Sequence, residues 1–401
     1  MSSGVVSTAV HPRSEASATG GRTLLVAGLA HALHDGYTDT LYVLLPLWQL
    51  EFGLGYGRLA LMRGLYAGAM ACFQLFAGRL AAGLGGRPVL ALGTALAALG
   101  YAFAGASAGV TGLSLALVLA GAGASVQHPI GAGAVSRAYG NAARSAIGLY
   151  NFSGDLGKAA VPAAISLVLA TTPWRHALWG LSVAGLAVAS AVLVFMPPLP
   201  SEPSAETAPR SAAPSGSPAS GFRLLLAIGM LDTATRMGLL TFLPFLLRNK
   251  GAPVATIGLG LALVFLGGAL GKAACGWLGA RLGLLRTVLL TEGATAVLIL
   301  ALLPLPLAPA MLVLPVLGTM LNGTSSVLYG TVPELRRAGT TESAFALFYT
   351  GVIGAGAVAP VAFGVLGDAA GASWATAATA VAALLTVPLA LALSRVSHRR
   401  L

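Results

Sequence analysis

The first long apolar stretch of the chain, residues 23–50, carries ionisable side chains in its middle. His31, Asp35 and Asp39 follow one another at intervals of four residues, so on a helix they line one face. His34 is about 100° around the helix from Asp35 and is expected to point elsewhere. A carboxylate in a poorly hydrated cavity and a histidine beside it can exchange protons near neutral pH. The spacing predicts a proton relay centred on Asp35, with a packing cluster of hydrogen bonds as the alternative.

Two later apolar stretches carry polar side chains of the same kind. His128 precedes Pro129, which cannot donate a backbone hydrogen bond and therefore predicts a kink or the end of a turn. Asp155 and Lys158 are three residues apart, a spacing that predicts an ion pair within one helix. Such a pair is either wholly structural or exchanges partners when Asp155 takes up a proton. The lysine is equally suited to bind an anion.

The second half of the chain adds its own charged residues. Asp232 and Arg236 are four residues apart and predict another pair on one helix. The guanidinium fork of Arg236 suits carboxylate, phosphate or phosphonate, which makes it the main candidate for holding an anionic group. Lys272 and Glu292 form a further pair if the loop between their spans is tight. Otherwise, Glu292 lies at the lipid headgroups.

These observations define two sets of candidate residues. The candidate proton-coupling residues are Asp35, His31, Asp39, Asp155, Asp232 and His128. The candidate substrate-binding residues are Arg236, Lys158, Asn151, Tyr150, Gln127, Tyr66, Tyr329 and Asn322. The aromatic members fit a cavity wall, although aromatic side chains at such spacing also serve as ordinary helix packing.

The elements that carry these residues are membrane helices. The chain has 401 residues, of which 56% are hydrophobic and only 9% charged, and its mean hydropathy is +0.84. Apolar runs of about 20 residues, enough for a helix to cross ~30 Å of hydrocarbon, recur along the chain. We expect an all-α membrane protein with twelve transmembrane helices, because helices satisfy their own backbone groups in lipid. The predicted spans are residues 23–50, 57–80, 88–107, 110–136, 141–170, 174–196, 222–248, 254–279, 284–304, 306–332, 340–366 and 370–394.

The net charge of +11 is distributed in a way that indicates membrane topology and not nucleic-acid binding. By this assignment, 15 of the 23 Lys and Arg residues fall in the tails and in every second loop. The positive-inside rule then places both termini in the cytoplasm. The polar first 22 residues contain no cleavable apolar core, so no signal peptide is expected.

The chain also repeats itself weakly at an offset of 198 residues. LLPLW matches FLPFL, so that Pro46 corresponds to Pro244, and Pro162 corresponds to Pro360. SAIGLY from Ser145 matches SAFALF at the same offset. The stretch between the halves is rich in Pro, Ser and Ala and reads as a linker. The predicted organisation is an N-terminal tail (1–22), a six-helix bundle (23–196), a cytoplasmic linker (197–221), a second six-helix bundle (222–394) and a C-terminal tail (395–401).

Two short loops resemble the motif G-x-x-x-D-R-x-G-R-R of the major facilitator superfamily. GRLAAGLGGR supplies Gly78 and Arg87, and GWLGARLGLLR supplies Gly276 and Arg281, which the resemblance assigns to gating loops. Ala stands at the position of the motif's aspartate in both loops, so the resemblance does not extend to the latch which that residue makes. The superfamily fold is two parallel six-helix bundles with the substrate site at the midplane between them.

Three stretches resemble the fosmidomycin-resistance branch of this superfamily. They are HALHDGYTDTLYVLLPLWQLEFGL, GAGASVQHPIGAGAVSRAYG and ARSAIGLYNFSGDLGKAAVP, with the H-x-x-x-D element, the HP pair and the Gly-rich fifth span of that branch. The resemblance implies a drug/proton antiporter, and the cationic candidates favour an anionic substrate. An importer of an organic anion or nutrient is the alternative, and a transport-inactive ligand sensor is a third.

The expected partners are a small-molecule substrate, protons and membrane lipid. Cys72 and Cys275 fall in apolar spans, and no H-E-x-x-H, G-x-S-x-G or P-loop sequence is present. We therefore expect neither an enzyme nor a metal site, and no cofactor other than the proton gradient that drives transport. The expected form is a monomer in a bacterial inner membrane.

Overall fold

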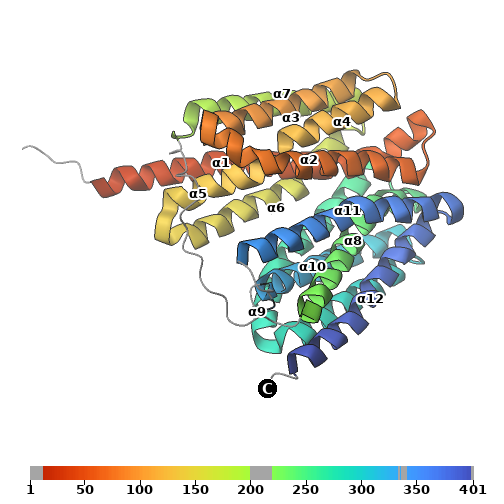
Figure 1. Ribbon diagram of the computed structural model, residues 1–401. Helices are drawn as coiled ribbons and strands as arrows, with labels where there is room; N and C mark the ends of the chain where they lie inside the picture. The colour runs from red at the N-terminus through yellow and green to blue at the C-terminus, as the bar shows by residue number, and fades with distance from the viewer. Residues whose placement is uncertain (1–11, 199–218, 333–334, 336–340, 399–401) are drawn as a thin grey trace, which may run out of the picture.

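A computed structural model shows an assembly of long helices and describes residues 12–198, 219–332, 335 and 341–398 (Figure 1). The predicted tails and linker lie in part outside these described ranges. The first half contains α1 (Pro12–Phe52), α2 (Tyr56–Leu84), α3 (Gly86–Ala106), α4 (Val110–Ala124), a π-helical turn (Gln127–Gly131), α5 (Ala132–Tyr139), a 3₁₀ turn (Gly140–Ala142), α6 (Ala143–Val168) and α7 (Trp174–Phe195). The second half contains α8 (Ala219–Asn249), α9 (Val254–Leu302), α10 (Leu307–Thr331), α11 (Thr341–Ala370) and α12 (Ala372–His398).

The membrane spans match the expected fold class. Among the described residues, ten segments are long and apolar enough to cross a membrane, and two of them, Val254–Gly279 and Arg281–Leu302, belong to α9. The helices α1 and α6 are absent from this set, although both are long enough. They carry Asp35, Asp39, Asp155 and Lys158, four of the charged residues singled out by the sequence. With α1 and α6 included, the twelve-helix membrane fold is confirmed.

The repeat is visible in the backbone as well as in the sequence. Gly53 and Gly251, at φ of 61° and 86°, end α1 and α8 in the left-handed region. Gly85 and Gly283, at φ of 86° and 75°, form the sharp break before α3 and the break within α9. Each pair is 198 residues apart, and glycine is the residue that enters this region without steric cost. The two halves therefore turn the chain at equivalent positions.

Helix packing follows the same repeat. In the first half α1 packs on α6 and α3 on α4, and in the second half α8 packs on α11 and α9 on α10. The seam between the halves is formed by α2 against α11, by α6 against α9 and by α1 against α8. The polar faces of α1, α6 and α8 consequently meet near the seam.

The predicted fourth span is not a continuous α-helix. It is interrupted by the π-helical turn that contains His128 and Pro129, after which α5 continues in the same direction. Proline lacks the N–H that an α-helix needs, and a wider π turn absorbs that defect. The turn carries His128 to the side of α1, where its ring lies 5.3 Å from that of His31.

The two halves join most closely at the end remote from the termini. There, Arg248 of α8 donates from Nη1 to the carbonyl of Pro46 at 2.9 Å and from Nη2 to Oε1 of Gln49 at 2.7 Å. One apolar core spans both halves at this end, whereas two smaller cores, one in each half, lie toward the termini. Figure 1 shows the helices of the two bundles diverging toward the side on which the C-terminus lies.

Asp368, near the end of α11, caps a helix of the other half. Its Oδ1 accepts from the backbone N–H of Tyr56 at 2.5 Å and its Oδ2 from that of Gly57 at 3.1 Å. These are the first residues of α2, whose own N-cap, Gly55, has no side chain to supply. A carboxylate is favoured at a helix N-terminus by hydrogen bonding and by the helix dipole. Asp368 thus acts as a latch between the halves.

We expect Asp368→Ala to weaken closure at this end, because loss of a capping side chain costs about 0.5–2 kcal/mol. Distance distributions between spin labels at the exposed residues Thr171 and Asn249, in a chain without its two native cysteines, should shift toward longer separations. Asp368→Asn keeps one acceptor oxygen and loses the charge, so it should lengthen these separations less than Asp368→Ala. Identical distributions for Asp368→Ala and the unchanged protein would contradict the latch.

Candidate functional site

A cavity of about 250 Å³ lies between the two halves, and most of the predicted charged residues line it. Its walls come from α1, α2, the π-helical turn and α6 of the first half and from α8, α9, α10 and α11 of the second. Its polar lining consists of His34, Asp35, Thr38, Asp39, Arg63, His128, Asp155, Lys158, Thr233, Arg236, Lys272, Asn322 and Tyr329. A small-molecule site of this kind, apolar with a few convergent polar groups, is typical of ligand-binding proteins.

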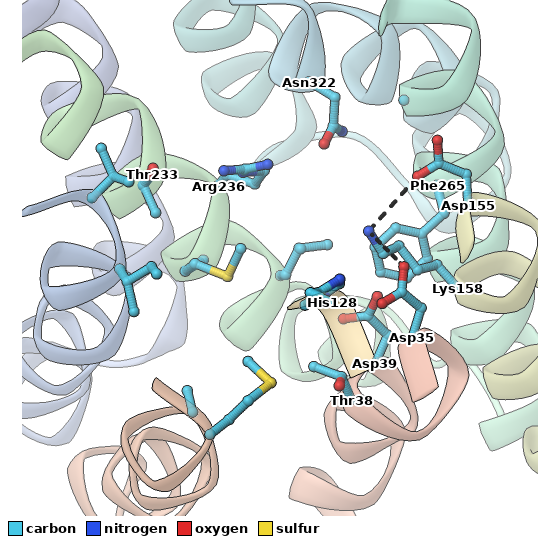
Figure 2. Close-up of a pocket in the computed structure, with 18 of the residues that line it drawn as sticks. Asp35, Thr38, Asp39, His128, Asp155, Lys158, Thr233, Arg236, Phe265 and Asn322 are labelled. Carbon is cyan, nitrogen blue, oxygen red and sulfur yellow. Dashed lines mark ion pairs between the residues drawn. The ribbon is translucent and has the colours of Figure 1, made fainter. Parts of the chain in front are cut away.

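A chain of ion pairs runs through the cavity from one half to the other. Lys158 of α6 lies 3.2 Å from Asp35 of α1 and 3.7 Å from Asp155, one turn earlier on its own helix (Figure 2). The ammonium group of Lys272, on α9 of the second half, lies 2.5 Å from the same Oδ1 of Asp155. The pair predicted within α6 is confirmed, but it is one link of a longer network. That network ties the halves together at the centre of the seam.

The expected pair between Lys272 and Glu292 does not form. The first span of α9 packs on α6, which brings Lys272 to Asp155 instead. Glu292 is only 2% exposed and lies inside the second bundle, so its alternative placement at the lipid headgroups is also wrong. Its side chain interacts with Asp232 of α8 and with Thr324 of α10.

Asp232 and Arg236 also depart from the expected pairing. No ion pair within 4.0 Å joins them among the residues that the structure describes, because Asp232 is turned to Glu292 in the bundle interior. Arg236, one turn further along α8, reaches into the cavity. Figure 2 shows it on the side opposite the cluster of Asp35, Lys158 and Asp155. Asp232 does not line the cavity.

Three histidines surround the carboxylate of Asp35. Nε2 of His31 is 3.4 Å from Oδ2 of Asp35, and Nε2 of His34 is 3.7 Å from Oδ1. The ring of His128 lies 4.8 Å from that of His34, edge to face. His34 therefore belongs to the cluster, contrary to expectation, because the 100° step still leaves its side chain within reach of the neighbouring carboxylate. The pair of His31 with Asp35 at i and i+4 is confirmed.

Tyr150 of α6 orients the ring of His31. Its Nδ1 lies 2.9 Å from the backbone carbonyl of Tyr150, and the two aromatic rings stack at 4.1 Å. Donation from Nδ1 to this carbonyl leaves Nε2 directed at Asp35. Ligand atoms of His31, Asp35 and His128 lie within 4.8 Å of one another and are of the types that bind metal ions. The ammonium of Lys158, 3.2 Å from Asp35, would compete with a metal cation there.

A glycine on α6 makes room for this cluster. A Cβ added to Gly154 would lie 2.5 Å from Oδ2 of Asp35 and 2.6 Å from Cε1 of His31. Any larger residue would displace the carboxylate and the imidazole together. The Gly-rich character of the fifth span thus has a direct structural reason, namely the close approach of α6 to α1.

The remaining candidates occupy different places around the cavity. Tyr329 and Asn322 line it from α10, and the hydroxyl of Tyr66 lies 3.1 Å from Oγ1 of Thr38, which lines it. Tyr150 and Gln127 are buried behind the histidines, with the Tyr150 hydroxyl donating to the Gln127 carbonyl at 3.3 Å. They form a second layer and not the wall itself.

Asn151 and the gating-loop residues lie away from the cavity. Asn151 is one turn from Asp155 toward the diverging ends of the bundles and is exposed. Gly78 lies in α2 and Gly276 in α9. Arg87 donates to the carbonyl of Met196 at 3.3 Å, and Arg281 lies over the ring of Trp277 at 4.1 Å. These contacts fix loop ends within each half.

Arg63 is a charged lining residue that belongs to neither set of candidates from the sequence. It lies on α2, is 5% exposed and reaches the cavity from the first half. The sequence does contain a signal for Arg63, because an ionised side chain inside an apolar span indicates a functional residue. The lack of a charged neighbour at helical spacing left it without a predicted partner.

Comparison with known proteins places the chain in a family. The model of the Major Facilitator Superfamily matches residues 27–231. The structure is similar to a bacterial homologue of the human lysosomal transporter Spinster in an inward-facing and occupied conformation, with 16% identity, a TM-score of 0.77 and coverage of 97% of this chain and 98% of that one. It is also similar to a mutant of the nucleoside transporter NupG, with 13% identity, a TM-score of 0.76 and coverage of 94% and 99%. At such identities these structures show the shared fold, and no curated protein matches the sequence.

We expect Gly154→Ala to destabilise the protein, because overpacking a tight contact costs about 1–3 kcal/mol. The unfolding temperature of the purified protein in detergent should fall. Gly148→Ala, on the same helix, is the matched control, since a Cβ there would meet no atom within 4 Å. Both substitutions favour the helix equally, so any difference between them reports the contact with Asp35 and His31. Equal unfolding temperatures would show that α1 and α6 do not meet in this way.

Proposed function

Because the chain belongs to the Major Facilitator Superfamily, we propose that it is a secondary transporter that exchanges a small organic anion for protons by alternating access. The family and the structural neighbours indicate a transporter and not an enzyme. The observation that carries the proposal of proton coupling is the ion-pair chain from Asp35 through Lys158 and Asp155 to Lys272. It places titratable groups of one half in contact with a cation of the other.

The ion pairs give protonation a mechanical consequence. An ionised group inside a membrane is retained when it has a partner, a wet cavity or a transport role. A proton on Asp155 would cancel the charge that holds Lys272, and a proton on Asp35 would cancel the charge that holds Lys158. Each event would loosen a contact between helices and free a lysine for another anion. Rocking of two rigid halves about a midplane site is how this fold alternates access.

The conformation supports the cavity's role as a binding site loaded from one side. The halves are latched at the end remote from the termini, by Arg248 with Pro46 and by Asp368 with the start of α2. If both termini are cytoplasmic, as the distribution of Lys and Arg suggests, the cavity faces the cytoplasm. The Spinster homologue to which the chain is similar was captured in an inward-facing conformation. We propose this orientation for a monomer in a bacterial inner membrane, with no cofactor.

The direction of transport is proposed from the resemblance to the fosmidomycin-resistance branch. That branch implies efflux, with protons entering as the substrate leaves. One observation favours the opposite direction. A bound anion would repel the ionised carboxylates of Asp35, Asp39 and Asp155, all of which line the cavity, and so favour the uptake of a proton with the anion. Import by symport is therefore the second candidate function.

A transport experiment with fosmidomycin as the probe separates these functions. In proteoliposomes, antiport predicts accumulation when the lumen is acidic, because protons leave as the probe enters. Symport predicts accumulation when the outside is acidic. We expect the acidic lumen to drive uptake and Asp35→Asn to lower that uptake at least tenfold, since the amide cannot exchange a proton.

Glu51→Gln is the matched control for Asp35→Asn. Glu51 is exposed at the closed end, where it pairs with Arg175 outside the cavity, so its neutralisation should leave gradient-driven uptake unchanged. Gradient-driven uptake that survives Asp35→Asn would overturn the role of Asp35. Binding of the probe without uptake under either gradient would identify a ligand sensor and refute transport.

A further inference from the structure

Two arginines face the cavity from opposite halves without a carboxylate partner. Arg63 belongs to α2 and Arg236 to α8, and both line the cavity. Within the described part of the chain, no carboxylate oxygen lies within 4.0 Å of either guanidinium, whereas Lys158 and Lys272 both have such contacts. The cationic lining therefore consists of two lysines that form ion pairs and two arginines for which no ion pair within 4.0 Å is found among the described residues.

The surroundings of Arg63 offer its guanidinium only weak acceptors and leave one of its donors unused. Its Nη2 lies 3.6 Å from the sulfur of Met237, and its guanidinium lies 5.0 Å from the centre of the Tyr42 ring. Its Nε is buried without a hydrogen-bond partner. Met237 is the neighbour of Arg236 in α8, so this contact brings the two arginines to the same part of the seam. An unpaired buried donor on a charged group is costly and points to a missing acceptor.

Arg236 shows the same deficit from the other half. Its Nε is also buried and without a partner. The carboxylates of Asp39, Asp232 and Glu292 lie in the surroundings of Arg236, and that of Asp39 also lies in the surroundings of Arg63, yet none of them is within 4.0 Å of either guanidinium in the described part of the chain. They lower the repulsion between the two cations without occupying their donors. The guanidinium groups of Arg63 and Arg236 can therefore donate hydrogen bonds to an anionic group that enters the cavity.

The rest of the lining indicates what kind of molecule carries that group. Thr233 and Asn322 add a hydroxyl and an amide, which suit an oxygen-rich headgroup. Met70, Leu240 and Phe265 supply apolar surface in the same cavity. A ligand that satisfies both parts has one oxyanion and a compact apolar body.

We propose that Arg63 and Arg236 form a two-sided clamp for the oxyanion of an amphipathic organic anion, of the carboxylate or phosphonate class. This proposal rests on the proposed function, for which it names the substrate subsite. A guanidinium fork presents two parallel donors to such a group, and two forks from different helices enclose it. Because one fork belongs to each half, the bound anion bridges the seam and replaces repulsion between two cations by attraction. Substrate thereby promotes closure of the halves around itself.

Binding to the purified full-length protein in nanodiscs tests the clamp. The probes are phenylphosphonate, benzoate and benzamide, which share an apolar ring and differ in charge, and isothermal titration calorimetry measures their affinity. We expect the two anions to bind and the neutral amide to bind at least tenfold more weakly. Arg63→Gln and Arg236→Gln should each weaken anion binding at least tenfold. The double variant should lose less than the product of the single losses, because both residues hold one group.

Two further variants test whether a loss of anion affinity is caused by the loss of the clamp itself. Arg58→Gln is the matched control, since Arg58 is an exposed residue of the same α2 and should leave anion affinity unchanged. Arg63→Lys keeps the charge but not the fork, so partial recovery of affinity relative to Arg63→Gln distinguishes a binding role from a structural one. Unfolding temperatures near that of the unchanged protein exclude misfolding as the cause of a loss.

Different experimental results would refute the clamp and the proposed function. Anion binding that is absent, or unaffected by either arginine variant, would overturn the clamp even if a proton gradient still drives transport. Anion binding that requires both arginines, together with transport indifferent to any proton gradient, would uphold the clamp and refute proton coupling.

Discussion

The energetic cost of an ionised side chain in lipid governs the arrangement of this protein. Insertion of one charged residue at the centre of a spanning helix costs about 2.5–3.5 kcal/mol, so each must face a partner or a wet cavity. The helices α1 and α6 carry Asp35, Asp39, Asp155 and Lys158 and are the long helices that fall short of the apolarity of the other spans. They pack on each other, and with α9 they enclose their charges at the seam. The seam is therefore the place where these helices hold their charged side chains away from lipid.

The two halves share a backbone but divide the chemistry between them. The glycines that turn the chain recur at 198 residues, whereas the polar residues that line the cavity have different residues at the same offset. His34 corresponds to Asp232, and Thr38 corresponds to Arg236. The first half supplies the histidines and all three carboxylates of the cavity, and the second half adds Lys272, which pairs with Asp155, and Arg236, which has no carboxylate partner within 4.0 Å among the described residues. The two halves thus share a fold but contribute different polar residues to the cavity. In the proposed function, the carboxylates and histidines of one wall take up protons and the arginine of the facing wall binds the anion.

The closed end and the cavity depend on each other. Arg248 and Asp368 hold the halves together at the closed end, which leaves the side chains at the midplane available to a ligand. The Lys272–Asp155 contact is an ion pair between the halves that lies within the cavity itself. Under the proposed alternating access the halves move as units, so opening the latch would also act on the Lys272–Asp155 contact. Packed helices respond to such changes as units, which is what alternating access requires.

The sequence by itself determined the membrane class, the twelve spans, the repeat and the positions of the ionisable residues, because hydropathy and helical spacing are local properties. The same spacing rule succeeded for His31 with Asp35 and failed for Asp232 with Arg236, since spacing says which side chains can meet and not what else competes for them. Only the tertiary structure decided that Lys272 binds Asp155, 117 residues away, and that Arg63 and Arg236 remain unpaired. Those outcomes depend on which helices pack together across the seam. In this protein the partners of a charge are set by that packing and not by its neighbours in the chain.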